Sequence, residues 1–118
     1  MAARFSRYRK LVQILKSHCP PGYPISVKRT QMPKKLEGQC WKHGKTFQIR
    51  IDKNLDEYRA MDVLLHEWAH ARAWNHMLDT AKDDETFNKL AHDAAWGVAY
   101  AEVYSVYEQK FIPAVSRI

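Results

Sequence analysis

Apolar residues recur at intervals of three and four near the amino-terminus of the chain. Phe5, Tyr8, Leu11, Val12 and Leu15 follow this spacing, which places them on one face of an amphipathic helix. We therefore predict a helix from about residue 4 to residue 18. The segment CPPGYP should end this helix, because proline and glycine do not continue it.

Three short segments with β-branched or aromatic residues come next, as is typical of strands. They are ISVKRTQ (25–31), GQCWK (38–42) and KTFQIRID (45–52). A turn around His43 and Gly44 separates the last two, and we expect a small three-stranded antiparallel sheet. The strand TFQIRID is expected at an edge of this sheet. There it would either be protected from pairing by Lys45, Arg50 and Lys53 or bind an extended peptide.

Two longer helical patterns follow the expected strands. One runs from about Glu57 to His76 and contains DVLLHEWAHARAW, and the other runs from about Asp84 to Gln109 and is rich in alanine and aromatic residues. The segment MLDTAKDD separates them and offers three candidate N-caps: Thr80, Asp83 and Asp84. With no repeat or linker, the pattern predicts a single α+β domain over residues 1–118.

Composition agrees with one soluble domain. The chain has 118 residues, of which 46% are hydrophobic, enough for one compact core and too many for a disordered chain. No stretch resembles a signal peptide or a membrane span, so an intracellular, cytoplasmic protein is expected. Cys19 and Cys40 form no Cys-x-x-Cys pair and are expected to be free thiols.

Charge is distributed unevenly along the chain, whose net charge is +6. Residues 1–53 carry a net charge of +11, whereas residues 54–118 carry −5. A basic half of this size could follow a phosphate backbone. A solvated surface that only aids solubility explains the same charge equally well.

The run DVLLHEWAHARAW contains the pattern His-Glu-x-x-His. His66 and His70 are four residues apart, so on a helix both imidazoles point to one place, as two ligands of a zinc ion do. Glu67 lies one residue further round and can reach a zinc-bound water. Zinc lowers the pKa of that water, and a carboxylate can take its proton and pass it to a leaving amine. The pattern therefore predicts Glu67 as general base.

A catalytic zinc needs a third protein ligand. His76 lies about 9 Å beyond His70 along the same helix and cannot reach the ion. The last predicted helix offers His92, Asp93 and Glu102. Two antiparallel helices with a short connection would place His92 opposite His70 and would place Glu102 opposite a residue beyond the start of the motif helix. His92 is therefore favoured over Glu102, and Asp93 is expected to be a supporting acceptor or a surface charge.

Aromatic residues form a stripe along the last predicted helix: Phe87, Trp96, Tyr100, Tyr104 and Tyr107. Such a stripe is usually part of a core. Tyr100 and Tyr104 are also candidates for stabilising the tetrahedral intermediate of peptide hydrolysis.

The sequences LLHEWAHARAW and HDAAWGVAYAEVY resemble the SprT-like zinc metallopeptidases, and GQCWKHGKTFQIRID is similar to the hairpin that precedes their active-site helix. The resemblance covers roughly residues 5–110 and implies a minimal zincin-like domain. It also implies zinc ligation by His66, His70 and His92 and catalysis by Glu67. Family members with a known role cut proteins crosslinked to DNA and often add a zinc ribbon. This chain has no such ribbon, and Asp93 stands where the family usually has glycine.

Three hypotheses of function follow. The leading one is a zinc-dependent peptidase in which Glu67 activates a zinc-bound water, with DNA-associated proteins as one class of substrate. The alternative is a basic nucleic-acid-associated module with a structural or vestigial metal site. A zinc hydrolase of non-peptide amides would use the same water chemistry.

The basic half should give weak, sequence-independent DNA binding, because phosphate contacts need only cations and suitable geometry. The candidate residues are Arg4, Arg7, Lys10, Lys28, Arg29, Lys34 and Lys35. Affinity for oligonucleotides should fall steeply between about 50 and about 200 mM salt. Reversing two of these charges to glutamate should weaken binding to every sequence while zinc content is unchanged. Absence of any complex at low salt would contradict this prediction.

Overall fold

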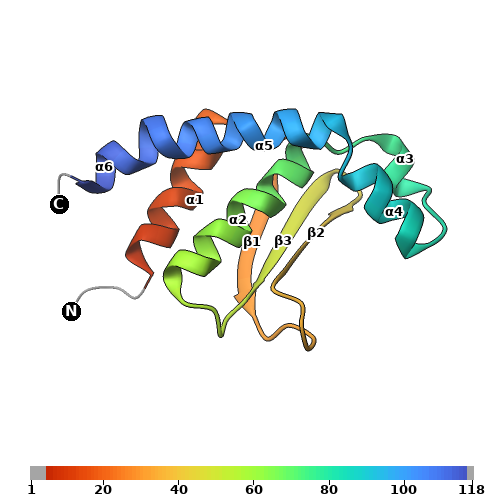
Figure 1. Cartoon of the computed structure of the whole chain (residues 1–118), viewed down its shortest axis with the longest axis horizontal. Helices are drawn as coiled ribbons and strands as arrows, with labels where there is room; N and C mark the ends of the chain where they lie inside the picture. Colours follow the sequence, from red (N-terminus) through yellow and green to blue (C-terminus); the bar gives the residue numbers. More distant parts are fainter. Residues whose placement is uncertain (1–4, 117–118) are drawn as a thin grey trace.

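The chain folds as a helix, three strands and a series of further helices, in a computed structural model that describes residues 5–116 (Figure 1). The elements are α1 (Ser6–His18), β1 (Ile25–Thr30), β2 (Gly38–His43), β3 (Thr46–Asp52), α2 (Glu57–Arg72), α3 (His76–Asp79), α4 (Asp84–Ala91), α5 (Ala94–Val106), η1 (Tyr107–Phe111) and α6 (Ile112–Ser116). This arrangement confirms the α+β class. No helix within residues 5–116 is both long and apolar enough to cross a membrane.

The sheet is mixed, so the prediction of an antiparallel sheet is wrong for one strand. Its order is β1-β3-β2, with β2 antiparallel and β1 parallel to β3. The predicted edge position of TFQIRID is also wrong, because β3 is central. Phe47, Ile49 and Ile51 on β3 are at most 3% exposed, and a central place buries this most apolar strand better than an edge does. The two edge strands are β1 and β2, and β2 is the edge strand that contacts α2.

Helix α2 covers one face of the sheet and carries the core of the molecule. Leu64 and Trp68 lie on one side of α2, are fully buried and pack with Ile49 and Ile51 of β3. The indole nitrogen of Trp68 donates a hydrogen bond to the carbonyl oxygen of Cys19, 2.8 Å away, at the end of α1. The buried apolar side of α2 therefore fixes its rotation relative to both the sheet and α1.

The helical region after α2 is more broken than predicted. Helix α2 ends at Arg72 rather than at His76, because Asn75 caps the short helix α3 by accepting from the Met77 amide. Asp83 caps α4 as expected, accepting from the Thr86 amide. The single long helix predicted for residues 84–109 is wrong, since the chain turns at residues 92 and 93 between α4 and α5.

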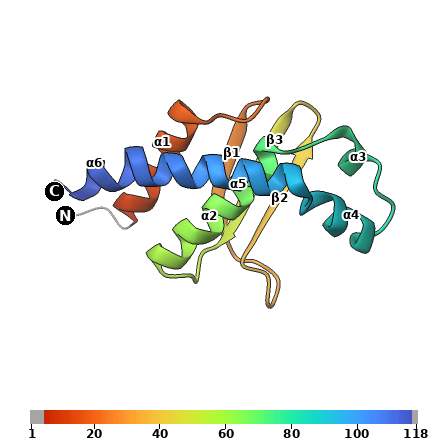
Figure 2. The ribbon, with the colours of Figure 1, turned by 45° about the horizontal axis from the view of Figure 1, so that its top comes forward.

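Asp93 explains this turn. Its backbone is extended, and its carboxylate accepts a hydrogen bond from the Trp96 amide at 3.1 Å, which makes it the N-cap of α5. An aspartate in this place stabilises a new helix start more than it stabilises a continuous helix. The turn sends α5 across α2 rather than alongside it (Figure 2). The antiparallel helix pair assumed from the sequence is therefore wrong.

The basic residues proposed to bind DNA differ in their surroundings. Lys10, Lys28, Lys34 and Lys35 are exposed, whereas Arg4 lies outside the described residues. Arg29 instead holds parts of the fold together. Its guanidinium group donates hydrogen bonds to the carbonyl oxygens of Lys53 and Leu55, and its Cζ atom lies 3.4 Å from the centre of the Phe5 ring. The buried Cys19 and Cys40 are free thiols, as predicted.

Replacing Asp93 by alanine should lower the free energy of unfolding by about 1 kcal/mol, because the α5 amide loses its cap. Asp93→Gly is the matched control. It should lower the free energy of unfolding by only about 0.3 kcal/mol, since glycine is also favourable at the cap position. Urea denaturation in the presence of a chelator measures both without a metal contribution. Equal losses in the two variants would show that the cap does not stabilise the turn.

Candidate metal centre

Three histidines from two separate segments meet above α2. His66 and His70 lie on consecutive turns of α2, and His92 lies in the turn between α4 and α5. One ring nitrogen of each lies within 4.8 Å of those of the other two. The structure thus brings together the three residues that the sequence analysis favoured as metal ligands. Their role as ligands stays a prediction.

The spacing of the His66 and His70 nitrogens fits a zinc ion. The Nε2 atoms of His66 and His70 are 3.2 Å apart. Two nitrogens bound to one tetrahedral zinc at about 2.1 Å lie about 3.4 Å from each other. His92 Nδ1 is 2.9 Å from the carbonyl oxygen of Asn88. Because a carbonyl can only accept, Nδ1 carries the proton and Nε2 keeps the lone pair that a metal needs.

The protein environment also favours neutral imidazoles, the form that binds metal. Burial, together with the neighbouring His66 and His92, lowers the pKa of His70 to about 3, against the opposing effect of a hydrogen bond with the Ala91 backbone. Burial and then His92 lower the pKa of His66 as well. The rings of His66 and His70 are therefore available as donors near neutral pH.

Glu67 is the acidic residue beside this cluster. It is 8% exposed and lines the two cavities that flank His66. Among the described residues, no hydrogen bond or ion pair is found for its carboxylate. Burial raises the pKa of this carboxyl to about 7. An accessible but largely desolvated carboxylate without a fixed partner is suited to exchange protons with a molecule bound in the cavity.

Gly38, at the start of β2, contacts the candidate site, and the sequence analysis missed it. A Cβ atom there would lie 2.5 Å from Cγ1 of Val63 and 3.2 Å from Oε2 of Glu67. Only glycine lets β2 approach α2 this closely at the Glu67 carboxylate. A lone glycine before a strand carries no sequence signal that distinguishes this role from a turn.

Two cavities form a continuous cleft along β2. Both are lined by Gly38, His66 and Glu67. The smaller one, of about 250 Å³, continues past Arg59 and Tyr100. The larger one, of about 560 Å³, continues toward α4. His66 and Glu67 therefore lie where the two cavities meet, whereas His70 and His92 line only the larger one.

Trp96 packs against all three histidines, which the interpretation of the aromatic stripe did not anticipate. Its ring centre lies 4.9 Å from that of His66, 5.4 Å from that of His70 and 5.2 Å from that of His92. The spacing of four from His92 is a signal that could have suggested this contact. Trp96 limits the orientations that the three imidazoles can adopt.

Of the other candidate residues from the sequence analysis, Tyr100 lies at the site, whereas Tyr104 and Glu102 do not. Tyr100 lines the smaller cavity together with His66 and Glu67, and burial raises the pKa of its phenol. Tyr104 does not line either of the two cavities of the cleft and lies with Tyr58 near Leu65. Glu102 forms an ion pair of 2.8 Å with Arg72, which lies about 200° round α2 from His70. Glu102 is thus directed away from the histidines.

Comparisons with known proteins add no assignment. No family model, curated protein or solved structure matches the chain. The resemblance to SprT-like zinc metallopeptidases therefore stays a prediction based on the residues named above.

Zinc should bind at about one ion per chain. His92→Ala should lower the affinity for zinc by more than about 100-fold, because loss of a residue that only supports a ligand lowers it by about 10- to 100-fold. Glu102→Ala should keep wild-type affinity, because it removes only a half-exposed ion pair. Competition with a chromophoric chelator measures both. Chelation should also lower the melting temperature, since zinc held only by the folded state adds to its stability. Equal losses in the two variants would contradict this ligand set.

Proposed function

We propose that this protein is a zinc-dependent peptidase of the SprT-like type. The observation that carries the proposal is the meeting of His66, His70 and His92 beside Glu67 in a cleft that borders a free strand edge. This combination offers a three-histidine donor set, a proton acceptor and a surface for an extended peptide.

The chain's own residues supply most of the proposed reaction. A zinc ion held by His66, His70 and His92 would lower the pKa of a water molecule and polarise the scissile carbonyl. Glu67 takes the proton from this water as its oxygen forms a bond with the carbonyl carbon. Glu67 then gives the proton to the amide nitrogen as the carbon–nitrogen bond breaks. The products are a carboxylic acid and an amine.

Tyr100 is the proposed donor to the carbonyl oxygen that becomes negatively charged. Its ring centre is 6.4 Å from that of His66, and it lines the same cavity as Glu67. The raised pKa of Tyr100 keeps its hydroxyl group protonated, so it can donate a hydrogen bond to a developing oxyanion.

The free edge of β2 favours a peptide over a small non-peptide amide as substrate. Strand β2 pairs only with β3 among the described strands, and its other edge faces the cleft that contains Glu67. Backbone groups on such an edge can pair with an extended chain. A small amide would use the zinc chemistry but would leave these groups without a role.

DNA-associated proteins stay the proposed class of substrates, because Lys28 on β1 and Lys34 and Lys35 before β2 are exposed and basic. They could hold the enzyme near nucleic acid through phosphate contacts. None of these three residues lines either cavity of the cleft, so DNA binding and catalysis would use separate surfaces.

Glu67→Gln should lower kcat/KM for peptide cleavage by at least about 100-fold, because general-base catalysis typically contributes a factor of about 100 to 10,000. Zinc content should remain near one per chain, since the histidines are unchanged. Glu108→Gln, at an exposed glutamate, is the matched control and should cleave like wild type. Cleavage by Glu67→Gln at the wild-type rate would exclude this residue as the base.

A further inference from the structure

The larger cavity of the cleft has an aromatic lining that the chemistry of peptide hydrolysis does not require. The rings of Trp74 after α2 and Phe87 of α4 line it together with His70 and Ala91. Trp41 of β2 also borders this cavity, but its ring lies 5.0 Å from the Arg50 guanidinium, on the other face of the sheet. The rings of Trp74 and Phe87 are 5.8 Å apart and meet edge to face. At about 560 Å³, this cavity has room for a large apolar side chain.

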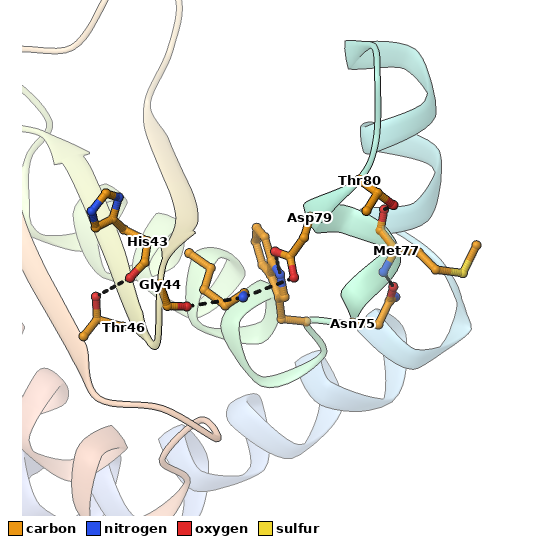
Figure 3. A network of polar contacts seen from close by, with 9 residues as sticks. His43, Gly44, Thr46, Asn75, Met77, Asp79 and Thr80 are labelled. Atoms are coloured by element: carbon orange, nitrogen blue, oxygen red, sulfur yellow. Dashed lines mark hydrogen bonds and ion pairs between the residues drawn. The ribbon is translucent and has the colours of Figure 1, made fainter.

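Trp74 is held in place by a polar network. Its indole nitrogen donates to Oδ1 of Asp79, 3.0 Å away, while Oδ2 of Asp79 lies 3.1 Å from Nζ of Lys42 on β2. Lys42 also donates to the carbonyl oxygen of Gly44 in the hairpin turn. Figure 3 shows these polar contacts, which extend from Gly44 to Asp79 on α3. The ring is also packed against the buried Phe47, so this wall of the cavity is built before any substrate binds.

The direction of β2 relates this cavity to the cleaved bond. Gly38 borders both cavities, whereas Gln39, Cys40 and Trp41 border only the larger one. Strand β2 therefore runs from the catalytic centre toward the aromatic wall. A peptide added antiparallel, the more stable pairing, runs the opposite way and passes the aromatic wall before it reaches Glu67.

From this geometry we propose that Trp74 and Phe87 form a subsite for an aromatic or large aliphatic side chain of the substrate. That side chain lies within three residues on the amino-terminal side of the cleaved bond, the distance along β2 from Gly38 to Trp41. Asp79 is a positioning residue that holds Trp74 in this wall. The inference rests on the proposed peptidase function and adds the substrate class.

Paired peptides that differ only in phenylalanine or alanine at these positions test the subsite. Mass spectrometry locates the cleaved bonds, and kcat/KM should favour phenylalanine by at least about tenfold, as expected for burial of several methylene equivalents. Phe87→Ala and Asp79→Ala should each bring this ratio toward one without loss of zinc. Tyr58→Ala, at an exposed tyrosine outside the cleft, should keep the full ratio.

A binding measurement separates this inference from the proposed function. Zinc-loaded Glu67→Gln protein should bind the fluorescently labelled phenylalanine peptide at least about tenfold more tightly than the alanine peptide, and the added Phe87→Ala change should remove the difference. If no peptide is cut but this difference is found, the peptidase function fails and the subsite stands. The subsite would be overturned if both peptides bound equally or if Phe87→Ala left the ratio of their affinities unchanged. A preference for phenylalanine only on the carboxyl-terminal side of the cleaved bond would overturn it too.

Discussion

The burial of one side of α2 is the constraint on which the rest of the structure depends. Leu64 and Trp68 are fully buried against the sheet, and His66 and His70 each lie two residues further on. Two residues correspond to about 200° round a helix. Packing of the apolar pair on β3 therefore turns the two imidazoles away from the sheet, toward α5. A rotation of α2 would lose the core and the histidine cluster together.

The burial and the pKa of Glu67 follow from its position on α2, between the apolar side of the helix and the side that carries His66 and His70. It faces the start of β2, where the absence of a side chain at Gly38 lets strand and helix meet. The carboxylate is consequently almost buried, which raises the pKa of Glu67, yet it still lines the cleft. One close contact between an edge strand and a helix thus places the Glu67 carboxylate beside the surface proposed to bind substrate.

The segment between α2 and α5 completes the cleft through three local helix caps. Asn75, Asp83 and Asp93 each accept a hydrogen bond from the first turn of the following helix. These caps divide the segment into short helices that change direction. As a result, α3 and α4 lie at the opposite end of the molecule from α6 (Figure 1). His92, Trp74 and Phe87 reach the cleft from this segment.

Local features of the fold and of the candidate site could be predicted from the sequence. Periodicity predicted the positions of α1, the strands and α2, because each depends on which neighbours along the chain are apolar. The spacing of His66, Glu67 and His70 follows from helix geometry alone. His92 was favoured because it is about as many residues from the predicted connection between the two helices as His70 is. The antiparallel helix pair assumed in that argument is not present.

Tertiary structure decided the features that depend on residues distant in sequence. The central position of β3 and the parallel pairing of β1 follow from burial of Phe47, Ile49 and Ile51 under α2, which no local pattern specifies. The contact of Trp96 with three imidazoles, the pairing of Glu102 with Arg72 and the aromatic wall near Trp74 arise where α5 and α4 fold back over α2. The sequence by itself determined which groups could do chemistry, and long-range packing determined which of them meet, because burial of apolar surface acts on the whole chain at once.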